Sequence, residues 1–213
     1  AMIRGYQGDS NQVDDKTKIA ACMKHFIGYH ATISGKDRTP SYIPDHVLSE
    51  YHIPSFKAAI DAGAKTIMIN SGIINGIPVH SSYKILTDLL RNQLGFEGVI
   101  LTDWEDINKL HDRDKIVSSK KEAIRLAINA GIDMSMVPYE YEEFIDNLME
   151  LVNEGKVTMD RIDEAVSKIL KLKFELDLFE NPSTNPSDYN DFGSEEFQDM
   201  AYQSAAEAIT LLK

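Results

Sequence analysis

One order of features recurs along the chain and constrains the fold more than any other: an amphipathic helical stretch, a glycine, a short apolar run and then polar residues. The helical stretches are Pro54–Ala62, Tyr83–Gln93 and Lys120–Ala130, and the glycines that follow them are Gly63, Gly95 and Gly131. A glycine in that place predicts a helix that ends in a left-handed residue. The recurrence is typical of an array of βα units with right-handed crossovers.

Four short apolar runs supply the strands of this array. They are Ile19–Phe26, Thr66–Asn70, Gly98–Thr102 and Ile132–Val137. Each run is apolar on both faces, which indicates a parallel strand that is covered on both sides. Polar residues gather where the runs end: Lys24–His25, Asn70–Ser71, Asp103–Trp104 and Asp133. Catalytic residues occupy this end of the strands in (β/α)8 barrels.

The C-terminal part of the chain has a different character. A helix pair, Glu140–Asn153 and Asp160–Leu176, follows the last apolar run, and Thr158 can cap its second member. The stretch Asn181–Gly193 is rich in Asn, Pro, Ser and Asp and predicts an extended linker, followed by a helix over Ser194–Leu212. The expected division is therefore an α/β domain over residues 1–180, then a linker and helix over 181–213.

Composition excludes several classes of function. The 34 acidic and 22 basic residues give a net charge of −12, which argues against a nucleic-acid partner. The apolar runs are too short to span a bilayer, and no signal peptide is visible, so the location stays unknown. The single cysteine, Cys22, excludes an intrachain disulfide and a cysteine zinc site. No predicted strand is followed by a glycine-rich phosphate-binding loop, and this argues against a nucleotide-binding site.

Two pairs of residues could carry chemistry, and each has a plainer alternative. Asp103 ends an apolar strand beside Trp104, the only tryptophan, which suits a nucleophile next to a flat face for a sugar ring. Equally, Asp103 could cap a loop and Trp104 could be a packing anchor. Lys24 and His25 could donate hydrogen bonds to sugar hydroxyls, or be a solvated lysine and a packing histidine; both can reach the strand mouth only where the chain bends.

Several longer stretches, taken in order, resemble glycoside hydrolase family 3, the β-glucosidase-like family. They are KHFIGY (24–29), GKDRTP (35–40), IPSFKAAIDAGAKTIMINSGIINGIPVH (53–80), LLRNQLGFEGVILTDWEDI (89–107), AINAGIDMSMVP (127–138) and RIDEAVSKILKLKFELDLFENP (161–182). The resemblance implies that residues 1–180 are βα units five to eight of a (β/α)8 barrel. It implies that residues 181–213 lead to a following domain absent from this chain.

The resemblance also implies a set of site residues. Asp103 matches the family's catalytic nucleophile, Lys24 and His25 match the pair that binds the glycone, and Trp104 flanks the sugar subsites. Ser71 stands where many members have a tyrosine. The acid/base of β-glucosidase-like members is a Glu on the following domain. The Asp-x-His dyad of the β-N-acetylglucosaminidase branch is absent, since Gly35 and Asp37 occupy its positions. No cofactor and no metal are implied.

The implied function is part of a retaining, exo-acting β-glycosidase that acts on terminal β-linked sugars through a glycosyl-enzyme on Asp103 and is inactive on its own. Lys24 and nearby donors are expected to keep the pKa of Asp103 low. The expected partners are a β-linked glycoside and either the missing barrel half and following domain or a second copy in a homodimer. The alternative is a non-catalytic half-barrel scaffold or carbohydrate-binding fragment.

Overall fold

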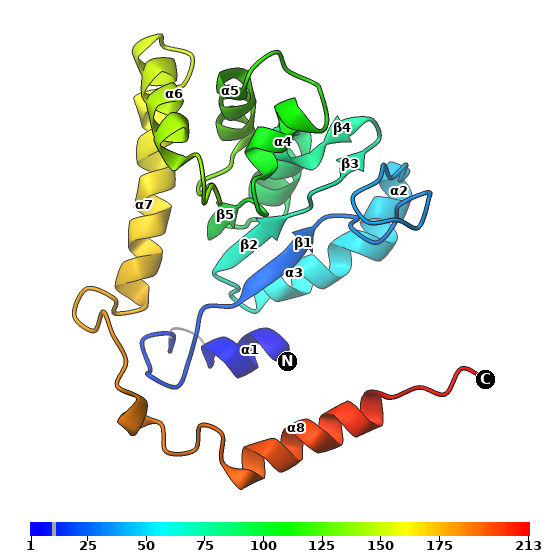
Figure 1. Cartoon of the computed structure of the whole chain (residues 1–213), viewed down its shortest axis with the longest axis vertical. Coiled ribbons are helices and arrows are strands. Elements are labelled where there is room, and N and C mark those ends of the chain that lie inside the picture. Colours follow the sequence, from blue (N-terminus) through cyan, green and yellow to red (C-terminus); the bar gives the residue numbers. More distant parts are fainter. Residues whose placement is uncertain (10–11) are drawn as a thin grey trace. The chain divides into compact units, whose positions relative to one another are not determined.

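Three parallel strands, in the spatial order β1–β2–β5, form the central sheet (Figure 1). They are β1 (Cys22–Phe26), β2 (Thr66–Ile69) and β5 (Val99–Leu101). This computed structural model describes residues 1–9 and 12–213, which form two units, Ala1–Leu176 and Asp177–Lys213. The expected α/β fold with a parallel sheet is confirmed for the first unit.

The fourth predicted strand, Ile132–Val137, runs beside β5 but pairs with it only through a bridge between Leu101 and Met134. The N–H groups of Asp133 and Met134 both donate to the carbonyl of Ile100. The N–H of Met136 donates to the side chain of Thr102 instead of a main-chain carbonyl. The prediction of a full strand is therefore wrong, because a side chain interrupts the regular ladder.

The predicted helices are present within a few residues of their expected ends. The helices of the first unit are α1 (Met2–Gln7), α2 (Asp45–Val47), η1 (Leu48–His52), α3 (Ile53–Asp61), η2 (Val79–Ser81), η3 (Lys84–Gln93), α4 (Asp106–Asp112), α5 (Lys120–Ala130), α6 (Tyr141–Asn153) and α7 (Met159–Glu175). The sequence did not indicate α1, α4 or the hairpin of β3 (Ile73–Ile74) and β4 (Ile77–Pro78). Helix η3 is π-helical.

The glycines expected to end three helices all have positive φ: 85° at Gly63, 72° at Gly95 and 118° at Gly131. Thr158 caps α7 by accepting a hydrogen bond from the N–H of Arg161, as predicted. Gly98 has another role, at the start of β5. A Cβ there would lie 2.1 Å from the carbonyl oxygen of Lys65, so β5 can approach β2 this closely only with glycine at that place.

One face of the sheet is covered throughout, and the other only in part. Met23, Ile67, Ile69 and Ile100 are buried in the core beneath the helices. On the other face Cys22 and Lys24 of β1 are exposed, and Thr66, Met68 and Leu101 are half-buried. Val99, in register with Thr66 on that face, is buried. The expectation of strands covered on both sides therefore holds at the start of β5 and is wrong for β1.

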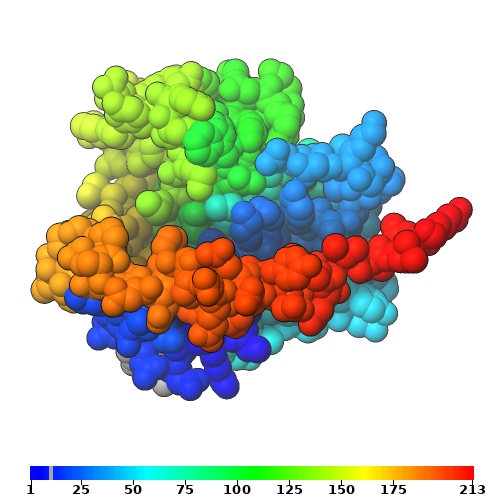
Figure 2. Space-filling model, turned by 60° about the horizontal axis from the view of Figure 1, so that its bottom comes forward, coloured from blue at the N-terminus to red at the C-terminus, as the bar shows by residue number. Residues whose placement is uncertain are grey.

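The second unit contains η4 (Pro186–Asp188) and α8 (Glu195–Ala208), drawn in orange to red in Figures 1 and 2. Ser194 caps α8 by accepting a hydrogen bond from the N–H of Phe197. The helix ends at Ala208, four residues before the predicted end at Leu212, because the chain turns extended at Ile209. Among the described residues no helix has both the length and the apolar character needed to cross a bilayer.

Candidate functional site

Asp103 lies just beyond the carboxyl end of β5 and is held by the chain around it. The N–H of Thr102 donates to the carbonyl of Met134, which ties the end of β5 to the 132–137 segment. One carboxylate oxygen of Asp103 accepts a hydrogen bond of 2.7 Å from the N–H of Trp104. Glu105 then has a positive φ of 61°, and α4 begins at Asp106. The strand end, the turn and the helix together orient the carboxylate.

The side chains of Arg38 and His25 approach the other oxygen of Asp103. Arg38 Nη2 lies 3.5 Å from Oδ2, and His25 Nε2 lies 4.0 Å from the same atom. His25 comes from β1, while Arg38 comes from the loop that follows β1, 65 residues before Asp103. The Asp103 side chain is only 15% exposed. The site is therefore a mostly covered carboxylate that faces a guanidinium and an imidazole.

The pKa of Asp103 lies below its ordinary value. Burial acts to raise the pKa, but the hydrogen bond from Trp104 and the charges of Arg38 and His25 outweigh burial. Asp103 is therefore ionised at neutral pH, as a nucleophile must be. The expected contribution of Lys24 is not found, because the cations within 4.0 Å of this carboxylate are Arg38 and His25.

His25 has a lowered pKa, because burial and the charge of Lys24 outweigh the attraction of Asp103. Its ring stacks on Tyr29, with 4.5 Å between the ring centroids. Lys24 is exposed and lines a cavity of about 250 Å³ together with His25 and Tyr29. The pairing of β1 with β2 shifts register between Met23 and Phe26, so the chain is irregular at the point where a bend was expected.

Trp104 is 46% exposed, and its ring meets Tyr139 edge to face with the centroids 5.8 Å apart. Tyr139 itself is 74% exposed. The two rings form an open aromatic corner next to Asp103, of the kind that contacts the apolar face of a sugar. Sequence reasoning missed Tyr139. The sequence feature that could have indicated it is its position, directly after Pro138 at the end of the fourth apolar run.

Ser71 is fully buried, unlike the other predicted site residues. Its hydroxyl lies 3.3 Å from Arg113 Nη1, and its carbonyl accepts a bond of 2.8 Å from Nη2 of the same arginine. Ser71 can therefore act on the site only by holding Arg113. The charge of Arg113 in turn lowers the pKa of the buried His80.

Asp133 does not join the other strand-end residues. Its buried carboxylate is held by Arg91 at 2.5 Å, by Arg161 at 3.0 Å and by the N–H of Ile100 at 2.9 Å. Arg91 also donates to the carbonyls of Phe96 and Gly98, which precede β5. The carboxylate therefore points toward the amino end of β5, away from Asp103, and its role is to join elements of the core.

A buried pair, His80 and Asp106, lies beneath the Asp103–Trp104 turn. His80 Nε2 is 3.6 Å from Asp106 Oδ2, and neither atom has a hydrogen-bond partner within the part of the chain that the structure describes. Lys109 bonds Asp106 Oδ1 at 2.8 Å and the carbonyl of Trp104 at 2.5 Å. Lys109 therefore ties Asp106 to the turn, and His80 faces the same carboxylate.

Burial lowers the pKa of His80 to about 4, against the attraction of Asp106. Because the unfolded chain binds this proton near pH 6.5 and the folded chain only near 4, folding stability falls as the pH drops through that window. Urea titrations at pH 7 and 4.5 should show His80→Gln losing less stability on acidification than the parent, by roughly 2–3 kcal/mol. His46→Gln, at an exposed histidine, should match the parent. Equal acid sensitivity of parent and His80→Gln would contradict this.

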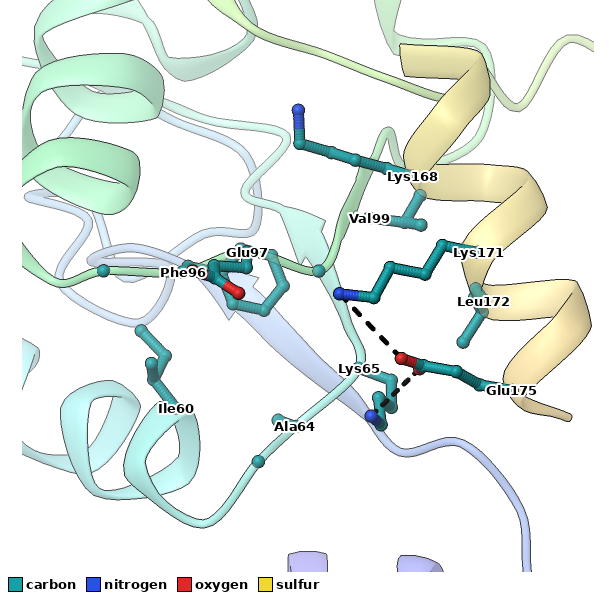
Figure 3. Close-up of a pocket in the computed structure, with 13 residues that line it drawn as sticks. Ile60, Ala64, Lys65, Phe96, Glu97, Val99, Lys168, Lys171, Leu172 and Glu175 are labelled. Atoms are coloured by element: carbon teal, nitrogen blue, oxygen red, sulfur yellow. Dashed lines mark ion pairs between the residues drawn. The ribbon is translucent and has the colours of Figure 1, made fainter. Parts of the chain in front are cut away.

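A separate cavity of about 210 Å³ lies at the amino ends of β2 and β5, against α7 (Figure 3). Glu175 lies between two of its lysines, with Oε2 2.9 Å from Lys65 Nζ and Oε1 4.0 Å from Lys171 Nζ. Glu175 is therefore shared by Lys65 and Lys171. The cavity is remote from the strand ends that carry Asp103. It is an ion-paired seam between the sheet and α7.

No group of three or more His, Cys, Asp or Glu side chains within residues 1–9 and 12–213 is arranged to hold a metal ion. Among the same residues, the carboxyl ends of the strands bring together Asp103, Arg38, His25 and the rings of Trp104 and Tyr139.

Comparison with known proteins places the chain in a family. The model of the glycosyl hydrolase family 3 N-terminal domain matches residues 1–172. The lysosomal β-glucosidase of Dictyostelium discoideum is 47% identical over all of this chain, which covers 27% of that protein. A β-xylosidase of Formosa agariphila is 32% identical, also over all of this chain, and 30% of it is covered.

A solved β-glucosidase structure from Erythrobacter marinus superposes on all of this chain with a TM-score of 0.90 at 31% identity. This chain covers 28% of that one. The chain thus spans less than a third of the length of these relatives. Because the family model matches most of the chain, the chain belongs to glycosyl hydrolase family 3.

Proposed function

We propose that this chain supplies the nucleophile and part of the glycone site of a retaining, exo-acting β-glycosidase of the β-glucosidase type. The observation that carries the proposal is Asp103, a carboxylate at the end of β5 whose pKa the N–H of Trp104 and the charge of Arg38 keep low. The exposed indole of Trp104 follows it directly. A charged nucleophile beside an apolar platform suits attack on a pyranose ring.

In the proposed reaction Asp103 attacks the anomeric carbon of a terminal β-linked sugar. A carboxylate oxygen forms a bond to that carbon as the bond to the leaving oxygen breaks, and an acid protonates the leaving oxygen. Water then attacks the glycosyl-enzyme, its proton passes to the same acid/base, and Asp103 is released as a carboxylate. Two displacements keep the β configuration.

The other residues bind the sugar. His25 lies beside Asp103, and Lys24 lines the neighbouring cavity with His25; in this proposal both donate to glycone hydroxyls. The Trp104–Tyr139 corner contacts the apolar face of the sugar. Ser71 acts indirectly, because its hydroxyl is buried against Arg113. The names of the relatives include a β-glucosidase and a β-xylosidase, and glucose is the glycone we propose.

The chain needs further parts to complete this site. A retaining glycosidase requires a second carboxylate about 5 Å from the nucleophile, which we place on the domain that follows the barrel. The partly covered face of the sheet is the face that the other half of a barrel would close. Because general acid catalysis alone contributes about 10²–10⁴-fold, the chain by itself is expected to leave alkyl β-glucosides almost unhydrolysed.

A second copy of the chain is the other way to close the sheet. Two chains related by a two-fold axis could pair their open edges into a ring of six strands and the two 132–137 segments. Light scattering after size exclusion would then give twice the molar mass of the chain. A stable monomer would leave the other barrel half as the cover.

Trapping with a 2-deoxy-2-fluoro-β-glucoside that carries a dinitrophenyl leaving group tests the function. Such a leaving group needs little acid assistance. In a protein as long as the relatives, Asp103 should therefore become covalently labelled, and mass spectrometry locates the label. Asp112→Asn, at an exposed carboxylate on α4, should label like the parent, and Asp103→Asn should not. A folded full-length protein that stays unlabelled would favour the non-catalytic scaffold or carbohydrate-binding alternative.

A further inference from the structure

The two side chains that face Asp103, Arg38 and His25, are themselves connected. Arg38 Nη1 lies 3.6 Å from Asp37 Oδ2, while Nη2 is the nitrogen that faces Asp103. The phenol of Tyr29 hydrogen-bonds to the same Asp37 side chain. The ring of Tyr29 stacks on His25. The contacts therefore run from Asp103 through Arg38, Asp37, Tyr29 and His25 back to Asp103.

The loop that carries Asp37 and Arg38 is held by its own hydrogen bonds. Its two sides are joined by Ile33 N–H to the carbonyl of Pro40 at 3.2 Å. The hydroxyls of Ser34 and Thr39 lie 2.5 Å apart, and Thr39 donates to the carbonyl of Lys36 at 2.7 Å. Asp37 and Arg38 thus sit at the tip of a braced turn.

The side-chain contacts explain how Arg38 stays on Asp103. The Arg38 side chain is 41% exposed, and an isolated exposed ion pair of a long side chain contributes little. Asp37 offers a second anion, and the hydroxyl of Tyr29 holds that anion in place. The hydrogen bond to Asp37 is the main reason why the pKa of Tyr29 is raised. The phenol therefore stays a donor at neutral pH.

We propose that Tyr29 and Asp37 are positioning residues that hold Arg38 and His25 against Asp103. The inference rests on the proposed function, since it concerns the groups that keep the nucleophile ionised. Neither residue needs to touch the sugar. Asp37 acts through Arg38, and Tyr29 acts through Asp37 on one side and through His25 on the other.

The proposal can be tested by the direction in which Asp37→Asn shifts the pKa of Asp103. Removing the negative charge of Asp37 acts directly to lower the pKa of Asp103, because a nearby like charge is lost. Losing the position of Arg38 acts in the opposite direction. A positioning role therefore predicts that Asp37→Asn raises the pKa of Asp103, while a purely electrostatic or structural role does not.

Other groups also act on Asp103 and must be kept unchanged. They are Arg38 and Tyr29 from the loop after β1, His25 from β1, the N–H of Trp104, Arg113 after α4 and His80 from η2. Tyr29→Phe is the cleanest variant, since it keeps the ring on His25 and alters no charge. It removes only the hydroxyl that holds Asp37.

The experiment is a carbon-13 carboxyl NMR titration of the whole chain, with the Asp103 signal assigned by its loss in Asp103→Asn. Asp37→Asn and Tyr29→Phe should each raise the pKa of Asp103 by roughly 0.2–0.7 pH units, the size of an exposed ion pair. Arg38→Gln should give the largest rise. Adding Asp37→Asn to Arg38→Gln should cause no further rise, because Asp37 acts through Arg38.

A fall or no change in the pKa of Asp103 in Asp37→Asn would overturn the inference, and so would a further rise in the double variant. In the full-length enzyme the acid limb of kcat/KM should move to higher pH by the same amount in Tyr29→Phe. Failure of the proposed function is distinct: Asp103 would then stay unlabelled by the fluoroglucoside, whatever the titration shows.

Discussion

Asp103→Asn in the full-length enzyme should lower turnover of a β-glucoside by roughly 10³-fold or more, because the amide keeps the shape of the side chain but cannot form the glycosyl-enzyme. The fold should remain. The ion pair with Arg38 is partly exposed, so its loss should cost less than about 1 kcal/mol. Steady-state kinetics and urea unfolding of the same preparation measure both quantities.

Asp112→Asn is the matched control for Asp103. The Asp112 carboxylate is exposed on α4, pairs with His111 and lies outside the site. Its replacement should leave kcat and KM within a factor of two. An Asp103→Asn protein that kept more than a tenth of the parental turnover would refute the role of Asp103 as nucleophile.

Asp133→Asn should cause the largest loss of stability. The Asp133 side chain is 1% exposed and is bonded to Arg91, Arg161 and the N–H of Ile100. Asparagine cannot balance these two largely buried arginines. Removing one partner of a buried ion pair costs about 3–5 kcal/mol, out of a typical total of about 5–15 kcal/mol. Urea unfolding of the whole chain, followed by circular dichroism, measures the loss.

The control for Asp133 is Asp61→Asn, which breaks an exposed pair with Lys57 on α3. Such a pair contributes about 0.3–0.5 kcal/mol. A loss of unfolding free energy for Asp133→Asn no larger than that for Asp61→Asn would contradict this role. The two arginines would then have found other partners, and the Asp133 carboxylate would not join η3, β5 and α7.

Much of the fold follows from the local pattern of the sequence. The helices α3, η3 and α5 lie where apolar periodicity and glycines indicated, because both signals are properties of a few neighbouring residues. The prediction of a fourth strand was wrong, because the side chain of Thr102 interrupts the hydrogen-bond ladder beside β5. A competing side-chain acceptor of this kind leaves no mark on periodicity.

The candidate site divides in the same way. Asp103 beside Trp104 was a local signal, since a carboxylate that ends an apolar strand is visible in a few letters. Arg38 lies in the loop after β1, and nothing local indicated that it reaches Asp103 across 65 residues. Asp133 carries the same strand-end signal as Asp103, but two arginines distant in sequence turn it into a core residue.

The sequence by itself determined the alternation of helices and strands, the strand-end position of Asp103 and, through its ordered motifs, the family. Only the tertiary structure decided that Arg38 and His25 face Asp103, that Asp37 and Tyr29 contact them, and that Asp133 points away from the site. The reason is physical. Secondary structure depends on residues a few positions apart, whereas ion pairing and burial depend on which distant segments the fold brings together.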